Sequence, residues 1–283
     1  MRHKIDRYDI KNFFAGLSTH TVLILVSLTC IFPLLWMVSS SLKTQQTVFK
    51  NMNLWPGVFN WSNFATAWTQ GGFGIYFLNS VFYTITVVIG LILVASLAAY
   101  AFSRMRFPGK NLFYYTFLAA MMIPIPGAFV ALYVLLVKLG LVNTRLGYIL
   151  PQINIGLSLA IYILKTFFDE IPKDIEDSAK VDGCSKLGVW WHIALPIAKP
   201  AIAVIAIFNT LAVWNEYILA MIILQDKTKM PLQRGLMIFQ GAHFTEYPLL
   251  MSGITITVIP VIIVYLFMQK HIIQGITAGA VKG

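Results

Sequence analysis

The sequence predicts an all-α integral membrane protein with six transmembrane helices. Hydrophobic residues make up 58% of the 283 positions and charged residues only 11%, whereas a soluble domain carries about 25% charged residues. The apolar residues gather in long runs, and about 20 of them suffice to cross the hydrocarbon core of a bilayer. A charged stretch, Ile171 to Gly183, separates two of these runs. Such an insert must lie in water, where a partner can reach it.

Six runs are long and apolar enough to be membrane spans. The fourth is the shortest and carries two amides, Gln152 and Asn154. No linker rich in Pro, Gly or Ser separates the runs, so we expect one integral permease domain over residues 1–283. The predicted spans are 18–42, 77–102, 112–137, 149–164, 201–224 and 250–268.

The distribution of Lys and Arg predicts the orientation of the spans. The amino-terminal segment, the second connection, the polar insert and the tail together carry roughly twice as many Lys and Arg as the other connections. Because basic residues favour the cytoplasmic side, we expect both termini and the insert in the cytoplasm of a multi-pass protein. The long loops 43–76 and 225–248 then lie outside, either as connectors or as a receiving surface for an extracytoplasmic partner.

The polar insert is predicted to fold as two short amphipathic helices joined at a glycine. Pro172 suits the first helical position, and acids follow it in the early turns, where the helix dipole favours them. Gly183 suits the end of this helix, and Ser185 can cap the next one, which Pro196 would end. The hairpin could lie on lipid headgroups. Its small residues and acids favour docking to a protein.

The spacing within the insert resembles a known signature. Asp177-Ser178-Ala179 is followed after three residues by Gly183, and after nine more by Ile193-Ala194-Leu195-Pro196. This is similar to the EAA loop of the inner-membrane permease subunits of ABC importers, which reads Glu-Ala-Ala, three residues, Gly, nine residues, Ile-x-Leu-Pro. Asp and Ser stand here for the first Glu and Ala of that pattern, and Glu176 keeps the acidic character just before them.

The resemblance covers nearly the whole chain. Trp214-Asn215-Glu216-Tyr217, Phe77-Leu78-Asn79-Ser80 and the glycine-rich tail 275–283 are similar to the carbohydrate-uptake permeases of the maltose type. The resemblance implies a cytoplasmic coupling-helix hairpin between spans four and five, over residues 169–199, set in a cleft of a separate ATPase. It also suggests that the tail touches the ATPase. The residues so implied in ATPase coupling are Glu176, Asp177, Ser178, Ala179, Asp182, Gly183, Leu195 and Pro196.

The same resemblance implies a function and a set of partners. The chain would be one permease subunit that imports a sugar or oligosaccharide by ATP-driven alternating access. Its partners would be a second, homologous permease subunit, two copies of an ATPase subunit, an extracytoplasmic solute-binding protein and membrane lipid. It would lie in the cytoplasmic membrane of a bacterium or archaeon and bind no cofactor itself, since ATP and Mg²⁺ would belong to the ATPase subunits.

Polar residues inside the predicted spans are candidates for the translocation pathway. Glu216 is the only acid within these spans, and an intramembrane acid is a functional hypothesis by default. Amides can replace the water around the hydroxyls of a sugar. The same side chains could instead bond one helix to another. The candidates are Gln152, Asn154, Asn209, Asn215 and Glu216.

The sequence argues against several other functions. It carries neither a phosphate-binding Gly-x-x-x-x-Gly-Lys-[Ser/Thr] loop nor a Gly-x-Ser-x-Gly elbow, so we expect no enzyme. The net charge of +10 lies at the ends of spans and forms no basic groove, which argues against nucleic acid. Two alternatives remain: an importer of another solute, such as a glycerol phosphodiester or a polyol, and a proton-coupled secondary transporter that uses Glu216.

Overall fold

The computed structural model describes residues 7–50, 53–122, 128–241 and 244–280. Over these ranges the regular structure is helical, and the one extended pairing is an isolated bridge between Gln240 and Thr245. The chain divides into two compact units. The first unit comprises residues 1–71 and 238–256, and the second comprises 72–237 and 257–283. The expected single permease domain stays a prediction.

The first unit contains α1 (Arg7–Ser41), α2 (Ser62–Gln70) and the first turns of α13 (Tyr247–Ala280). Nδ2 of Asn63 on α2 donates to the carbonyls of Ser41 and Lys43, at 2.7 and 2.8 Å. These bonds satisfy carbonyls that the end of α1 leaves without an intrahelical partner. The loop that follows α1 is thereby fastened to the last turn of that helix.

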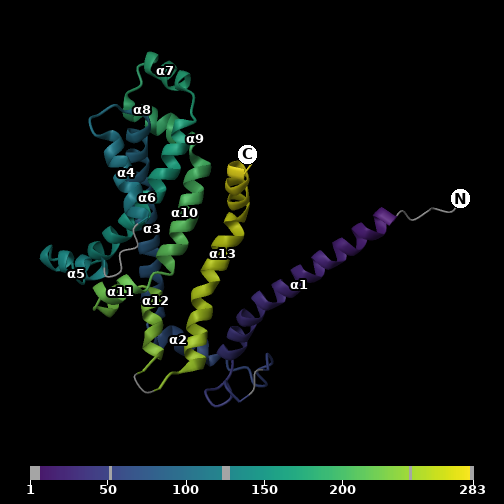
Figure 1. Cartoon of the computed structure of the whole chain (residues 1–283). Helices are drawn as coiled ribbons and strands as arrows, with labels where there is room; N and C mark the ends of the chain where they lie inside the picture. The colour runs from purple at the N-terminus through teal and green to yellow at the C-terminus, as the bar shows by residue number, and fades with distance from the viewer. Residues whose placement is uncertain (1–6, 51–52, 123–127, 242–243, 281–283) are drawn as a thin grey trace. The chain divides into compact units, whose positions relative to one another are not determined.

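The second unit is built on three helices that pack side by side: α3 (Phe73–Arg104), α6 (Arg145–Asp169) and α10 (Lys199–Trp214) (Figure 1). Small side chains on α3, Ala95 and Ala99, are fully buried in their shared core. The shorter helices of this unit are α4 (Lys110–Met122), α5 (Ala128–Lys138), α7 (Lys173–Val181), α8 (Lys186–Val189), α9 (Leu195–Ile197), α11 (Ile218–Ile223) and α12 (Leu232–Gly235). Two more helical turns are the π-helix η1 (Trp190–Ala194) and the 3₁₀-helix η2 (Lys227–Lys229), and the 3₁₀-helix η3 (Leu236–Phe239) follows α12.

One close approach in this core lies at a glycine. A Cβ on Gly156 of α6 would collide with Oδ1 of Asn209 on α10 and lie 2.9 Å from Leu91 on α3. A larger residue at this level would have to displace the side chains of Asn209 and Leu91.

Four described helices are long and apolar enough to cross a membrane, which agrees with a multi-pass membrane protein. They are 16–41 of α1, α3, α6 and 247–269 of α13. A fifth span results if 186–197 and α10, which meet at a bend of 76°, count as one. The predicted count of six stays a prediction.

The predicted span boundaries differ from the helices in three places. The predicted span 112–137 corresponds to two helices, α4 and α5, and its middle, 123–127, lies outside the described residues. The predicted span 149–164 is too short, because α6 continues for a turn or more at both ends. The predicted span 201–224 is interrupted after Trp214, and the chain becomes helical again only in α11.

Candidate functional site

The polar insert forms the predicted pair of short helices. α7 ends at Val181, and Gly183 follows with a φ of +84°, a conformation that side chains disfavour. The Ser185 hydroxyl then accepts a hydrogen bond from the amide of Gly188 at 3.1 Å and caps α8. Figure 1 shows this hairpin at the end of the bundle where α7 and α8 turn back toward α9.

Two proline assignments in the hairpin were wrong by a residue or two. Pro172 does not occupy the first helical position, because α7 begins at Lys173 and Pro172 is extended before it. Pro196 does not end the second segment, since α9 continues to Ile197 and the chain bends at Ala198. Pro196 therefore lies near the end of a continuous helical stretch, 186–197, directly after the π turn. Pro200 lies in the first turn of α10.

The second half of the hairpin contains a wide π turn. The amide of Leu195 bonds to the carbonyl of Trp190, five residues earlier, and η1 covers Trp190–Ala194. The ring of Trp190 and the methyl of Ala194 are buried in the core shared with α3 and α6. Trp191, by contrast, is 56% exposed. A π turn shifts the faces of a helix, and here one tryptophan points inward and the next outward.

A buried ion pair fastens the hairpin to the end of α3. Nε of Arg104 lies 2.5 Å from Oε1 of Glu176, and a terminal nitrogen of Arg104 donates to the carbonyl of Ile171 at 2.6 Å. The side chains of Arg104 and Glu176 are only 11% and 4% exposed. Glu176 therefore faces α3 and not the open surface, where we expected it to meet a partner.

A second polar contact lies beside this ion pair. The hydroxyl of Ser103 donates to Oδ1 of Asp169, and Nζ of Lys165 lies 2.6 Å from Oδ2 of the same carboxylate. Asp169 is the last residue of α6, so the bond from Ser103 holds the end of α6 to α3, while Lys165 pairs with Asp169 within α6. Sequence reasoning missed Arg104 and Ser103, because no spacing rule relates the end of one span to a loop 72 residues further on.

The outer surface of the hairpin is open and partly apolar. Asp177, Ser178, Asp182 and Gly183 are exposed, whereas Ala179 is half-buried. Leu195 is half-buried and Pro196 exposed, further along the hairpin. An ion pair with Lys180 at 2.7 Å lowers the pKa of Asp177, which keeps this carboxylate charged. Four large apolar side chains share the open surface, and we call them the outer face of the hairpin: Ile175, Val181, Leu187 and Trp191.

The candidate pathway acid, Glu216, caps a helix. Its Oε1 accepts the amide of Leu219 at 2.6 Å, and its Oε2 accepts the amide of Ala220 and the hydroxyl of Tyr148, both at 3.1 Å. A carboxylate placed in this way satisfies the free amides of the first turn of α11 and complements its dipole. Both oxygens of Glu216 are therefore engaged in joining α11 to α6.

The other pathway candidates do not come together around one cavity. Gln152 is buried in α6, whereas Asn154 is exposed and lines pockets between α6 and the helices α4 and α5. Asn209 bonds the carbonyl of Ile205 and lies against α6. Asn215 accepts a hydrogen bond from Gln233 at 3.2 Å. Asn215 thus joins the end of α10 to α12, whereas the bond of Asn209 lies within α10.

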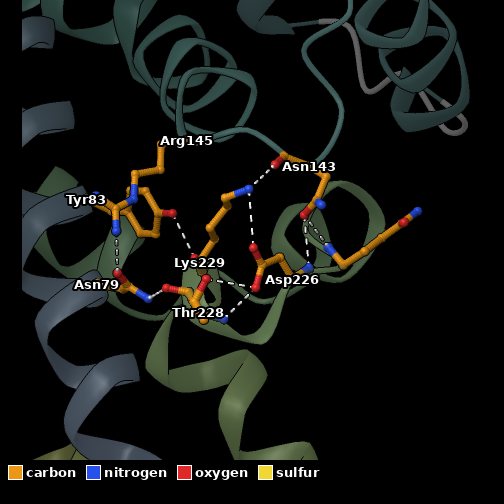
Figure 2. Close-up of polar contacts among 8 residues, drawn as sticks. Asn79, Tyr83, Asn143, Arg145, Asp226, Thr228 and Lys229 are labelled. Atoms are coloured by element: carbon orange, nitrogen blue, oxygen red, sulfur yellow. Dashed lines mark hydrogen bonds and ion pairs between the residues drawn. The ribbon is translucent and has the colours of Figure 1, made fainter.

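A second polar cluster, unforeseen in the sequence, lies at the opposite end of α3 (Figure 2). Nδ2 of Asn79 donates to the carbonyls of Thr228 and Met230, at 2.8 and 3.0 Å, and the hydroxyl of Tyr83 donates to the carbonyl of Lys229 at 2.7 Å. The amide of Leu232 donates to the Ser80 hydroxyl. We call residues 225–232 the clamped loop. Asn79 and Ser80 belong to the Phe-Leu-Asn-Ser stretch that carried part of the resemblance.

Asn143 holds the clamped loop from the other side. Its Oδ1 accepts the amides of Gln225 and Asp226, at 3.0 and 2.9 Å, and its carbonyl accepts Nζ of Lys229 at 3.0 Å (Figure 2). Asn143 has a φ of +58°, the one positive φ among the described non-glycine residues. Asn tolerates this conformation better than most residues. Nothing in the spacing of the sequence predicted this contact.

Comparisons with known proteins agree with the geometry. A family model described as "Binding-protein-dependent transport system inner membrane component" matches residues 91–278, which include the whole hairpin. The diacetylchitobiose uptake system permease protein NgcG of Streptomyces coelicolor is 34% identical over 271 residues, covering 95% of this chain and 89% of the relative. The trehalose transport system permease protein SugB of Mycobacterium tuberculosis is 35% identical over 254 residues, covering 89% of this chain and 92% of the relative.

A solved structure has a similar fold. A chain in the crystal structure of a bacterial ABC transporter involved in the import of the acidic polysaccharide alginate superposes with a TM-score of 0.81. The match covers 95% of this chain and 99% of that chain, at 24% sequence identity. The helical arrangement of the protein is therefore one already seen in a transporter.

Proposed function

Because this chain belongs to the inner-membrane components of binding-protein-dependent transport systems, as a carbohydrate-uptake ABC permease, we propose that it passes a sugar or oligosaccharide through the cytoplasmic membrane by ATP-driven alternating access. It works as one subunit beside a second permease, two ATPase subunits and an extracytoplasmic solute-binding protein. The chain itself performs no chemistry. ATP and Mg²⁺ bind to the ATPase subunits.

The hairpin is the element that receives the force of the ATPase. The observation that supports this role is the contrast between its two sides. The inner side is bound to α3 by the Arg104–Glu176 pair and to the core by Trp190, whereas the outer face exposes apolar side chains, among them Val181 at 88%. Exposed apolar side chains on an otherwise polar element mark a contact with another protein. A force applied to the outer face passes to α3 through the buried contacts.

The coupling residues divide into two groups on this proposal. Asp177, Ser178, Asp182 and Gly183 lie on the open side of the hairpin and contact the ATPase directly. Glu176 acts from inside, by holding α7 in position against Arg104. Leu195 and Pro196 lie at the other end of the hairpin, close to the bend at Ala198, and move together with it.

The proposed class of solute rests on the names of proteins similar in sequence. Several proteins similar in sequence carry names of transport systems for diacetylchitobiose, arabinooligosaccharides, trehalose and maltose. A sugar or short oligosaccharide is therefore the solute that we propose. The proton-coupled alternative is weakened by Glu216, since a carboxylate that accepts two amides and a hydroxyl is occupied as a helix cap.

Substitution of the outer face tests the proposal. The variants Val181→Ser and Leu187→Ser remove exposed apolar side chains without touching the core, and we expect both to release the ATPase from the purified complex. Phe244→Ser is the matched control, because Phe244 is 61% exposed on a loop outside the hairpin. Co-purification with the ATPase subunit and ATP-dependent uptake of a labelled oligosaccharide into proteoliposomes are the two measurements.

Two results would overturn the proposal. Full retention of the ATPase by both hairpin variants would remove the hairpin from the interface. Uptake driven by a proton gradient, without ATP and without other subunits, would favour the secondary transporter instead. Glu216→Gln would then abolish the coupling to protons.

A further inference from the structure

The loop that follows α1 carries a cluster of exposed aromatic rings. The rings of Trp55 and Phe59 meet edge to face at a centroid distance of 5.1 Å, and those of Phe59 and Trp61 stack at 6.5 Å. Trp55 is 72% exposed, Trp61 65% and Phe59 40%. We call these three residues the aromatic cluster. Rings that pack on one another and are still exposed leave apolar surface for a further contact.

Hydrogen bonds fix this cluster at the end of a membrane span. The span in α1 ends at Ser41. The amide of Asn60, between Phe59 and Trp61, donates to the carbonyl of Leu42 at 2.9 Å. Asn63 binds the carbonyls of Ser41 and Lys43, as described above. The aromatic cluster therefore lies next to the last turn of a helix that crosses the bilayer.

Exposed aliphatic side chains adjoin the cluster, and its segment of the sequence carries no acidic residue. Val58, between the rings, is 75% exposed, and Leu54 is 41% exposed. The sequence holds no Asp or Glu from Lys43 to Tyr76. The amides beside the rings are already engaged, because Nδ2 of Asn60 donates to Oδ1 of Asn63 and Nδ2 of Asn63 donates to the carbonyls of Ser41 and Lys43. A site for sugar would need such groups to bond hydroxyls instead. Exposed aliphatic side chains gain instead from an apolar medium, and a segment without carboxylates is not repelled by anionic lipid.

We propose that Trp55, Phe59 and Trp61 form a membrane anchor that inserts into the interfacial layer of the bilayer at the end of α1. Tryptophan is enriched at this depth, because its ring is apolar while its N–H can bond to headgroups or water. Val58 enters the same layer between the rings. The anchor sets the depth of the first long loop and, through Asn60 and Asn63, the depth of the last turn of α1.

A fluorescent label can measure the depth of the anchor. The background is the full-length chain with the subunits that purify with it, carrying Cys30→Ser and Cys184→Ser. One variant then adds Val58→Cys, and the control adds Lys227→Cys, an exposed position with polar neighbours on the clamped loop. Each cysteine carries an environment-sensitive dye. The complexes are placed in nanodiscs, and quenching by interfacial nitroxide lipid is compared with quenching by aqueous iodide.

We expect the dye at position 58 to be quenched about twofold more by nitroxide lipid than the dye at position 227, and less by iodide, since interfacial aromatic segments lie at headgroup depth. Adding Trp55→Ser, Phe59→Ser and Trp61→Ser should move the dye at position 58 into reach of iodide. The proposal is overturned if the dye at position 58 responds to iodide as the control does. It is equally overturned if the dye is shielded from both quenchers, because a protein partner then covers the cluster.

Discussion

Asn79 and Arg104 lie near opposite ends of α3, and each fastens a loop from elsewhere in the second unit. At the first end, neutral amide and hydroxyl groups bond the backbone of the clamped loop. At the second end, a buried ion pair and an apolar core hold the hairpin. The clamped loop depends on many bonds of modest strength. The hairpin adds to its apolar core one buried ion pair, in which the loss of either member leaves the other charge uncompensated.

The difference has an energetic consequence. A neutral hydrogen bond contributes about 1 kcal/mol net, and losing one of several leaves the others in place. Removing one member of a buried ion pair leaves the other charge without compensation, at a cost of about 3–5 kcal/mol. The end of α3 that holds the hairpin should therefore respond to single substitutions in a nearly all-or-none manner, whereas the clamped loop should loosen by steps.

The largest effect is expected at the ion pair. Glu176→Gln and Arg104→Gln should each destabilise the hairpin by about 3 kcal/mol and reduce ATP-coupled uptake at least about tenfold, because each strands a buried charge. Protease protection of the hairpin and uptake into proteoliposomes are the measurements. The double variant Arg104→Gln with Glu176→Gln should cost less than the sum of the two. Additive losses would mean that the pair is not coupled and that the comparison fails.

The next effect concerns the turn of the hairpin. A Cβ at Gly183 would meet no atom of this chain within 4 Å, so within the chain a substitution there acts through the backbone conformation. Gly183→Val should cost about 1–2 kcal/mol, and Gly183→Asn clearly less, since Asn tolerates a positive φ. We expect Gly183→Val to lower the uptake obtained per ATP hydrolysed. Equal behaviour of the Val and Asn variants would show that strain at this turn is irrelevant.

A graded effect is expected at Asn143. Asn143→Asp keeps the acceptor oxygen, Asn143→Gly keeps the backbone conformation but loses the acceptor, and Asn143→Ala loses the acceptor and keeps the strained φ. Amide hydrogen exchange in the clamped loop should rise in that order, by about 1–2 kcal/mol of local opening in total. If the Gly variant protects the amides of Gln225 and Asp226 as well as Asn does, the side chain has no part in the clamp.

The smallest effect is a response to acid at Asp226. Hydrogen bonds from the hydroxyl and amide of Thr228 lower the pKa of Asp226 below its usual value near 3.8. The contribution of this carboxylate to the clamped loop is therefore complete above that usual value and is lost as the pH falls through the lowered pKa. A carboxyl ¹³C titration of Asp226 should report the lowered midpoint. Thr228→Ala should raise it, and an unchanged midpoint would exclude this cause.

Local rules predicted the hairpin well, because its signals are close together in the sequence. The turn at Gly183 and the cap at Ser185 each depend on a few neighbouring residues. The Arg104–Glu176 pair spans 72 residues, and Asn79 reaches a loop 149 residues away, so no periodicity could relate them. The contacts of Glu216 with Tyr148 and the amides of α11 are likewise ones that sequence spacing does not identify, and its place in the translocation pathway stays a prediction.

The π turn was equally invisible, because the sequence Trp190–Ala194 is compatible with an ordinary helix. The break after Trp214 was missed for a related reason: the apolar run continues through it, and composition cannot distinguish one long helix from a helix, a cap and a second helix. The glycine-rich tail, 275–283, includes residues 281–283, which lie outside the described residues. Its predicted contact with the ATPase stays a prediction.

Residues 186–197 and α10 meet at a bend of 76°, so the second half of the hairpin is joined to this long helix nearly at a right angle. Ala198, at the bend, is fully buried. On the proposed function, a push along residues 186–197 would reach α10 almost at right angles and displace it across its axis rather than along it.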